Sequence, residues 1–205
     1  MGTVYIVDDD TTFARGVARL VEAAGWVPRV FASAAEFLAY ETAAEDEACV
    51  LLDVRMPGMR GPDAHRAMLA AGSDLPVIFL TGHGDIPTSV DAIKRGAIDF
   101  LEKPVPSPVL IAAIRNAFAR HAERRARAGE RRSAQERVER LSAREYQVMQ
   151  HVIAGRMNKQ IAADLGISEK TVKVHRGKVM DKMEARSVAM LVDLCRIAGV
   201  EPARV

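Results

Sequence analysis

The first half of the chain alternates short apolar runs with longer stretches whose apolar residues recur every three or four positions. The short runs predict strands at residues 4–7, 27–31, 49–52, 77–80 and 98–101. The longer stretches carry one-sided apolar stripes and predict helices at residues 13–24, 34–43, 63–71, 87–95 and 107–120. This alternation predicts an α/β fold with a five-stranded parallel sheet and helices on both of its faces.

From Leu141 onward the pattern is purely helical. Ser142 and Glu145 have the spacing of a capping box, which predicts a helix that ends near Ala154. Further helix N-caps are predicted at Asn158, Ser168 and Ser187. Gly166 lies between a short helix and a longer one, so we expect a helix-turn-helix within an all-α domain of four helices.

Residues 122–140 join the two patterns. They contain many arginines and glutamates but almost no large apolar residues. Such a stretch cannot bury a broad face, so we expect a solvated spacer, helical except near Gly129. A DNA-binding arm is the alternative interpretation of the same arginines. The predicted divisions of the chain are residues 1–121, 122–140 and 141–205.

The net charge of +2 for all 205 residues hides a difference between the halves. Residues 1–119 carry 10 Lys and Arg against 16 Asp and Glu (−6), whereas residues 120–205 carry 19 against 11 (+8). The basic half is the candidate for binding nucleic acid. We find no secretory leader and no membrane-spanning run, and we expect Cys49 and Cys195 to be buried thiols of a cytoplasmic protein without a membrane partner.

Polar residues gather where the predicted strands end. Three consecutive acids follow the first strand: Asp8, Asp9 and Asp10. Asp53 follows the third strand, Thr81 the fourth and Lys103 the fifth. The carboxyl ends of parallel strands form one ligand-binding edge, and clustered carboxylates suit a hard cation such as Mg²⁺. Acids, a hydroxyl and an ammonium on this edge predict a site that accepts a phosphoryl group.

Four motifs occur in order at these strand ends: Val-Asp-Asp-Asp at 7–10, Asp-Val-Arg-Met-Pro-Gly at 53–58, Leu-Thr-Gly at 80–82 and Lys-Pro at 103–104. Together they resemble the receiver domain of two-component response regulators, over residues 1–121. The resemblance implies a CheY-like (flavodoxin-like) fold, a sensor histidine kinase as partner and Asp53 as the phosphoacceptor.

The resemblance also implies a role for each residue around Asp53. Asp9 would bind Mg²⁺ directly, Asp8 would assist directly or through water, and the Asp53 carboxylate and the backbone carbonyl of Arg55 would complete the protein ligands. Asp10 would only cap the following helix. Lys103 would pair with the acids and then with the phosphate. After phosphorylation Thr81 would hydrogen-bond the phosphate, and Phe100 would follow Thr81 inward. A cis peptide bond is implied between Lys103 and Pro104.

Residues 141–199 resemble the four-helix DNA-binding domain of the LuxR/NarL class of response regulators. The resemblance rests on Leu-Ser-Ala-Arg-Glu at 141–145 and on the nearly continuous string from Gly155 to Arg176. Asp-Phe-Leu-Glu-Lys-Pro at 99–104, Thr-Gly-His-Gly-Asp at 81–85 and Val-His-Arg at 174–176 are most similar to the FixJ branch.

Helical geometry assigns two faces to residues 168–183. One face is predicted to pack inward through Val172, Val179 and Met183. The opposite face would meet DNA: Lys173 as a base-edge donor and Val174 against a thymine methyl. Contacts to phosphates are predicted for Lys170, Thr171, Arg176 and Lys178. His175 either touches a phosphate or is half-buried, and Gly177 leaves a base contact at its own position in doubt.

These features predict a phosphorylation-activated transcription regulator, not a dedicated enzyme. It would form a homodimer through the fourth and fifth predicted helices, at 87–95 and 107–120, and partly through the apolar final helix. It would bind double-stranded promoter DNA and act on RNA polymerase. One alternative is a DNA-binding dimer that uses its first half only as an interaction module. Another is a haloacid-dehalogenase-like phosphatase with Asp8 as nucleophile, since residues 8–12 also fit Asp-x-Asp-x-Thr. Such phosphatases need a second acidic pair on a late strand, and no such pair follows Thr81 in this sequence. The phosphatase hypothesis also leaves Asp53 without a role.

Overall fold

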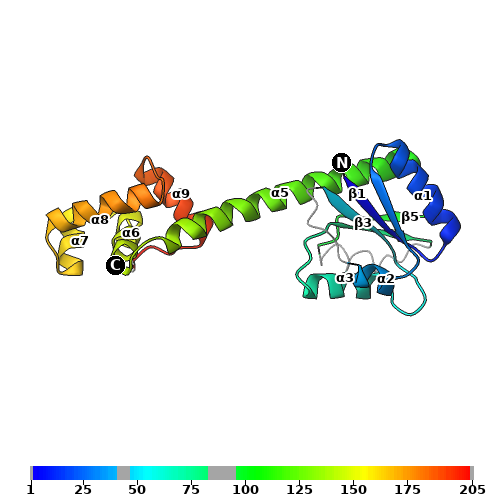
Figure 1. Cartoon of the computed structure of the whole chain (residues 1–205), viewed down its shortest axis with the longest axis horizontal. Coiled ribbons are helices and arrows are strands. Elements are labelled where there is room, and N and C mark those ends of the chain that lie inside the picture. The colour runs from blue at the N-terminus through cyan, green and yellow to red at the C-terminus, as the bar shows by residue number, and fades with distance from the viewer. Residues whose placement is uncertain (1, 41–46, 83–95, 204–205) are drawn as a thin grey trace. The chain divides into compact units, whose positions relative to one another are not determined.

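The computed structural model describes residues 2–40, 47–82 and 96–203. The chain divides into two compact units, Met1–Arg125 and Ala126–Val205 (Figure 1). The first unit contains the predicted sheet and the second is helical. Each unit has its own apolar core and is described separately.

The first unit is built on a parallel sheet, which confirms the predicted α/β class. Its strands are β1 (Thr3–Val7), β2 (Val27–Phe31), β3 (Ala48–Asp53), β4 (Val77–Thr81) and β5 (Asp99–Glu102). The strand order is β2-β1-β3-β4-β5. The register pairs Asp53 with Leu80 and Thr81 with Glu102, so the carboxyl ends of the three strands from β3 to β5 meet at one edge.

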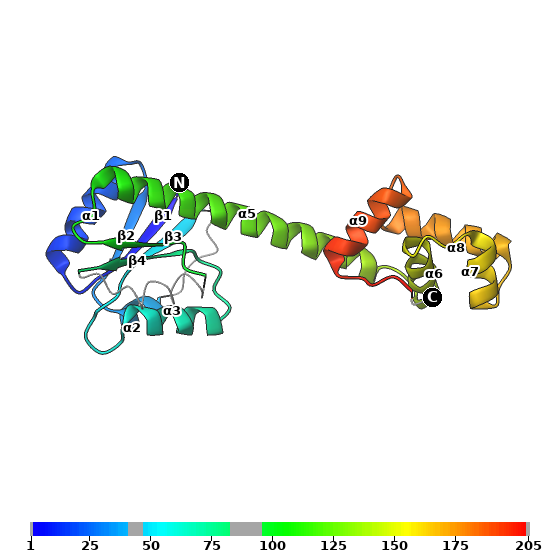
Figure 2. The same ribbon diagram turned by 180° about the vertical axis from the view of Figure 1, so that it is seen from behind.

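Helices cover both faces of this sheet, as Figures 1 and 2 show. The helices are α1 (Thr11–Ala23), α2 (Ala34–Ala39), α3 (Gly61–Ala70) and α5 (Ser107–Glu139). Alternate residues of β1 point to opposite faces: Val4 and Ile6 pack with α1 and α5, whereas Tyr5 and Val7 pack with α2 and α3. The helix predicted at 87–95 lies outside the described residues.

Helix α5 confirms that the spacer is helical and corrects one detail of that prediction. It extends from the predicted helix at 107–120 to Glu139 and runs unbroken through Gly129, where we expected an interruption. Arginine and glutamate are good helix formers, and one glycine costs only about 1 kcal/mol relative to alanine. The stretch also buries more than we expected: Ala134 is only 1% exposed and Val138 packs on the core of the second unit. The packing of Val138 and an ion pair of Arg137 with Glu184 at 3.0 Å therefore attach the end of this helix to the second unit.

The second unit consists of the end of α5 and four further helices. These are α6 (Ala143–Ile153), α7 (Asn158–Leu165), α8 (Glu169–Lys182) and α9 (Val188–Ala198). The predicted capping box of Ser142 and Glu145 is present, and Ser168 and Ser187 cap the helices that follow them. Gly166 adopts a left-handed conformation (φ 63°) between α7 and α8, which completes the helix-turn-helix.

The predicted cap at Asn158 is wrong by one residue. The N-cap is Met157, and Asn158 is the first residue of α7. Met157 has no side chain that can cap the helix. Gln160 Oε1 instead accepts a hydrogen bond from the Met157 backbone N–H at 2.9 Å, so this donor at the start of the helix has a partner. Asn158 instead uses its side chain to accept a hydrogen bond from Arg176 of α8 at 3.1 Å.

The two cysteines and the hydropathy of the helices were also the subject of predictions. Cys49 and Cys195 are free, buried thiols, and burial raises the pKa of both. Within the described part of the chain, none of the helices combines the length and hydropathy needed to cross a membrane.

Candidate functional site

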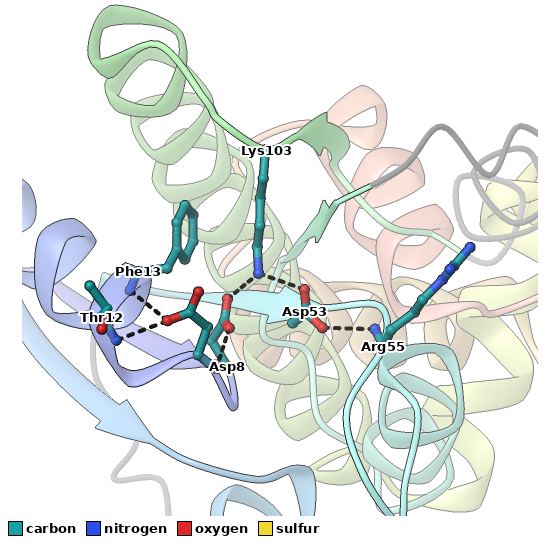
Figure 3. Close-up of polar contacts among 7 residues, drawn as sticks. Asp8, Thr12, Phe13, Asp53, Arg55 and Lys103 are labelled. Atoms are coloured by element: carbon teal, nitrogen blue, oxygen red, sulfur yellow. Dashed lines mark hydrogen bonds and ion pairs between the residues drawn. The ribbon is translucent and has the colours of Figure 1, made fainter.

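Lys103 occupies the centre of a charged cluster at the carboxyl edge of the sheet (Figure 3). Its ammonium donates to Asp8 Oδ2 at 2.6 Å and to Asp53 Oδ1 at 2.7 Å. Asp8 is 1% exposed and Asp53 is 5% exposed. Residues that lie 95 and 50 positions from Lys103 along the chain thus meet at one nitrogen.

The backbone holds the second oxygen of each carboxylate. The Asp10 N–H donates to Asp8 Oδ1 at 3.0 Å, and the Arg55 N–H donates to Asp53 Oδ2 at 2.8 Å. Both bonds span two residues, so each aspartate is fixed by the turn that immediately follows its strand. One oxygen of each acid is anchored by the backbone and the other faces the shared cation.

The charges of this cluster influence one another. Burial raises the pKa of Asp8, and the hydrogen bond and charge of Lys103 act against that rise. Burial alone would lower the pKa of Lys103, but hydrogen bonds to Asp53 and Asp8 outweigh it, so the pKa of the ammonium is raised. Lys103 therefore stays charged at neutral pH and offsets the repulsion between two buried acids.

Gly61 sets the distance between α3 and strand β3, a role that sequence reasoning missed. A Cβ at this position would lie 2.2 Å from the backbone oxygen of Asp53. The Gly61 N–H donates to the Val54 oxygen at 3.2 Å, so the first turn of α3 rests directly on the end of β3. The Gly-Pro pair at 61–62 was the available signal, because proline favours the first turn of a helix.

The remaining predicted receiver residues lie around the same edge. Thr81 ends β4 and is buried, and its backbone oxygen accepts from the Lys103 N–H at 2.7 Å. Phe100 of β5 is half-buried, with its ring centroid 6.2 Å from that of Phe79. The Lys103–Pro104 peptide bond is cis, as predicted. Asp9 is exposed beside Asp8.

Asp10 caps α1, as expected. Its Oδ1 accepts from the backbone N–H groups of Thr12 at 2.9 Å and Phe13 at 3.0 Å. The cap orients Phe13, whose ring centroid lies 4.4 Å from the Lys103 ammonium (Figure 3). In the sequence, Phe13 is only the first apolar residue of the helix predicted at 13–24, so its contact with Lys103 was not predicted.

The donor set suits a hydrated divalent cation. Asp8 and Asp53 direct carboxylate oxygens toward one point, and Asp9 adds a third acid at the solvent side. Among the described residues, no three His, Cys, Asp or Glu side chains converge as a ready-made metal cage. Mg²⁺ retains several waters and needs only one or two carboxylates, so these residues fit it.

The second candidate surface is the exposed side of α8. Val172, Val179 and Met183 are fully buried, which confirms the predicted inner face. The opposite side is exposed, with members Lys170, Lys173, Val174, Gly177 and Lys178. Val174 is 52% exposed among these cations, so its methyl groups are available for an apolar contact such as one with a thymine methyl.

Three residues of α8 are less available than this cationic face. The Arg176 guanidinium donates to Asn158 Oδ1, so it is directed toward the start of α7. The Thr171 hydroxyl lies 2.8 Å from the Ser168 hydroxyl at the helix cap. His175 is half-buried, which is one of the two alternatives that the sequence left open.

An ion pair holds the start of α6 against the end of α8. Lys182 Nζ lies 2.6 Å from Glu145 Oε2. The hydrogen bond from Lys182, followed by that from the Ser142 backbone, lowers the pKa of Glu145 to about 2. Glu145 thus acts both as a cap residue of α6 and as an anchor for the helix that carries the cationic face.

Comparison with known proteins places both units in families. Residues 4–115 match the response regulator receiver domain, and residues 139–195 match the bacterial regulatory proteins of the luxR family. The receiver match alone covers more than half of the chain. This protein therefore belongs to the response regulators, the transcription regulators that join a receiver to a LuxR-type DNA-binding domain.

Its relatives extend over nearly the whole chain. The transcriptional regulatory protein FixJ of Azorhizobium caulinodans is 42% identical over 98% of this chain and 94% of its own. The response regulator protein TodT of Pseudomonas putida is 43% identical over 92% of this chain and 83% of its own. The solved structure of the response regulator StyR superposes with a TM-score of 0.83 at 42% identity, covering 95% of this chain and 98% of that one.

Proposed function

We propose that Asp53 accepts a phosphoryl group from a sensor histidine kinase, and that the phosphorylated protein dimerises and binds promoter DNA. The observation that supports this most directly is the position of Lys103 between Asp53 and Asp8. An ammonium that is charged at neutral pH and lies against an acceptor carboxylate can pair with the oxygens of a dianionic phosphoryl group. The family of the chain favours Asp53 over Asp8 as acceptor.

The transfer can be described with the groups that surround Asp53. An Asp53 carboxylate oxygen attacks phosphorus in line, the phosphorus–nitrogen bond of a phosphohistidine breaks, and its electron pair leaves with the imidazole. An acyl phosphate forms on Asp53. Lys103 exchanges its bond to Asp53 for a phosphoryl oxygen, and the Arg55 N–H continues to orient the other carboxylate oxygen.

Receiver domains as a class use Mg²⁺ at this site. Here Asp9, Asp8, Asp53 and the backbone carbonyl of Arg55 would hold the ion, which neutralises equatorial phosphoryl oxygens when bound. Lys103 and the metal would then divide the phosphoryl charge between them. The same acyl phosphate is open to attack by water, so slow self-dephosphorylation would return the protein to its resting state.

The signal would leave the site through Thr81 and Phe100. The Thr81 hydroxyl would donate to the new phosphate, and Phe100 would turn inward behind it. Both residues lie at the edge formed by β4 and β5, and Phe100 is half-buried against Phe79, so its movement would alter the surface of β5. We assign the dimer contact to that altered surface.

The DNA contact is assigned to α8. Lys173 and Val174 would meet base edges in the major groove, and Lys170 and Lys178 would meet phosphates. Arg176 and Thr171 are assigned to phosphates with the additional role of fixing the helix cap and α7. His175 and Gly177 would lie at the border of this contact. The functional divisions remain residues 1–121, 122–140 and 141–205, in a cytoplasmic protein that acts on RNA polymerase.

Mass spectrometry after treatment with acetyl phosphate and Mg²⁺ tests the acceptor. We expect one added phosphoryl group, on the peptide that contains Asp53. A group on Asp8 would favour the phosphatase alternative, and an unlabelled protein would remove the basis of the proposal. The alternative of a DNA-binding dimer that does not depend on phosphorylation needs a separate test. If this alternative is right, the Asp53→Asn variant will bind promoter DNA as tightly as the activated wild type.

A further inference from the structure

The ring of Phe13 closes one side of the Lys103 ammonium. The ammonium is 4.4 Å from the ring centroid, within the range of a cation–π interaction, and it also contacts Asp8 and Asp53. The Lys103 side chain is 17% exposed. Two acids and an aromatic face therefore surround a cation that would otherwise be free to turn toward water.

The ring is itself fixed by its place in the fold. Phe13 lies in the first turn of α1, where its N–H donates to Asp10 Oδ1 at 3.0 Å. Its side chain is half-buried and packs on the apolar layer between α1, α5 and the sheet. The third acid of the motif thus has an indirect use: it caps the helix that presents this ring to the ammonium.

This contact matters most when Lys103 changes partners. During phosphorylation the ammonium must release Asp53 and meet phosphoryl oxygens at the same rim. A flexible lysine that has lost one carboxylate can populate several rotamers in water. The negative face of an aromatic ring attracts the ammonium and excludes water from one side, so fewer of those rotamers remain.

We propose that Phe13 is a positioning residue of the phosphoryl site, which acts by holding the Lys103 ammonium against its ring while the phosphoryl group arrives. The inference rests on the proposed function, namely that Asp53 is the acceptor. The opposing interpretation is that Phe13 only fills the core, in which case any apolar side chain of similar size would serve as well. The two interpretations differ in one property, the electrostatic potential of the ring face.

Fluorination of the ring separates electrostatics from packing. Phenylalanine analogues with one, two and three fluorines are placed at position 13 of the full-length protein by codon reassignment. Fluorine weakens the negative face of the ring with little change in its size. Intact-mass spectrometry measures the rate constant for phosphorylation of Asp53 by acetyl phosphate. We expect this rate constant to fall with each added fluorine and, with three fluorines, to be about three- to tenfold below that of the unfluorinated protein.

The same series at position 37 is the matched control. Phe37 is a buried phenylalanine of the other face, where it packs with Tyr5 and Phe31 and not with a cation. Fluorination there should leave the rate constant unchanged. A flat or rising series at position 13 would overturn the inference, whereas a fall there beside a flat series at position 37 supports it.

A second measurement needs neither metal nor phosphodonor. In protein labelled with ¹³Cε-lysine, the ring current of Phe13 should shift the Lys103 methylene signal upfield, and the Lys103→Arg variant assigns that signal by its loss. Phe13→Tyr should keep the shift, and Phe13→Leu should lose it. In the acetyl phosphate assay, Phe13→Tyr should keep the wild-type rate constant, and Phe13→Leu should be phosphorylated about three- to tenfold more slowly. A wild-type signal at the position of exposed lysines would contradict the contact.

The two proposals fail in different ways. If acetyl phosphate does not label Asp53 in the wild type, the acceptor assignment fails, and the positioning role fails with it even where the ring-current shift is present. If Asp53 is labelled and the fluorinated series is flat, only the role of Phe13 is lost.

Discussion

At the scale of single residues, each charged group of the acceptor site is held by more than one partner. Asp8 and Asp53 each bond to a backbone N–H and to Lys103, and Lys103 also faces Phe13. Removing one partner of a buried pair leaves an uncompensated charge, which costs far more than an exposed pair does. The site is therefore sensitive to small displacements of the backbone that carries it.

Gly61→Ala is the sharpest test of that sensitivity. A Cβ would lie 2.2 Å from the Asp53 carbonyl oxygen, so α3 or the end of β3 must shift. We expect the variant to lose about 1–3 kcal/mol of unfolding free energy, the usual cost of overpacking, and to be phosphorylated more slowly. Chemical denaturation followed by the fluorescence of Trp26, in the first unit, measures the first effect, and intact-mass spectrometry measures the second.

Gly16→Ala is the control for this substitution. Gly16 lies inside α1, and a Cβ there meets nothing within 4 Å. The same change of residue should stabilise the first unit by about 0.5–1 kcal/mol, because alanine loses less backbone entropy than glycine in a helix. Equal destabilisation at both positions would contradict the role assigned to Gly61.

Residue types at strand ends revealed most of the acceptor site, because the parallel topology brings those ends to one edge. Asp8, Asp53, Thr81 and Lys103 were identified in this way. Phe13 was not, because an apolar residue in an apolar stripe has the same pattern whether it faces a core or a cation. Contacts between a ring and a distant lysine depend on the third dimension, which periodicity along a single helix does not contain.

At the scale of secondary-structure elements, the ion pair of Glu145 and Lys182 fixes α8 to α6. The lowered pKa of Glu145, about 2 against 4.5, means that the folded protein stabilises the charged form. This contribution is fully present above pH 4.5 and is lost as pH falls from 4.5 toward 2. Acid should therefore loosen the helix-turn-helix specifically.

Glu145→Gln tests this anchor. We expect a loss of about 1–3 kcal/mol in the local stability of α6 and α8 at pH 7, since the amide cannot supply the negative charge that pairs with Lys182. Hydrogen exchange of peptides from both helices measures it, and the difference from wild type should shrink below pH 4.5. The exposed Glu139→Gln is the control and should exchange like wild type at every pH.

The cationic face of α8 predicts two kinds of lysine. Lys173→Ala should cost about 1–3 kcal/mol on the preferred duplex and little on other sequences, because a base-edge contact reads sequence. Lys178→Ala should weaken all duplexes alike and reduce the salt dependence of the logarithm of the binding constant by about 1. Fluorescence anisotropy over a range of salt concentrations, with a duplex selected from a random pool, measures both. Equal behaviour of the two variants would contradict the division.

At the scale of the whole molecule, the order of strand and helix signals predicted a parallel five-stranded sheet followed by a helical unit, and both are present. The continuity of α5 through Gly129 was not predicted. The charged composition favours a helix, but it gives no sign that Ala134 is buried or that Val138 packs on the core of the second unit. The cap at Met157 was missed for a similar reason, since Gln160 supplies the bond from inside the helix.

The final prediction concerns the transmission of phosphorylation to DNA binding. Phosphate can alter DNA affinity only if it stabilises one state of the protein, here the dimer-competent state, more than the other. Phosphorylation should therefore increase both dimerisation and DNA binding. With beryllofluoride and Mg²⁺, we expect the wild type to shift from monomer to dimer and to bind a two-fold symmetric duplex about 5- to 150-fold more tightly. Asp53→Asn should show neither change. Asp63→Asn, which changes a partly exposed acid of α3 paired with Arg66, should respond fully. Light scattering measures the first response and anisotropy the second. A dimer that forms without tighter DNA binding would separate the two units functionally and leave the receiver as an assembly module alone.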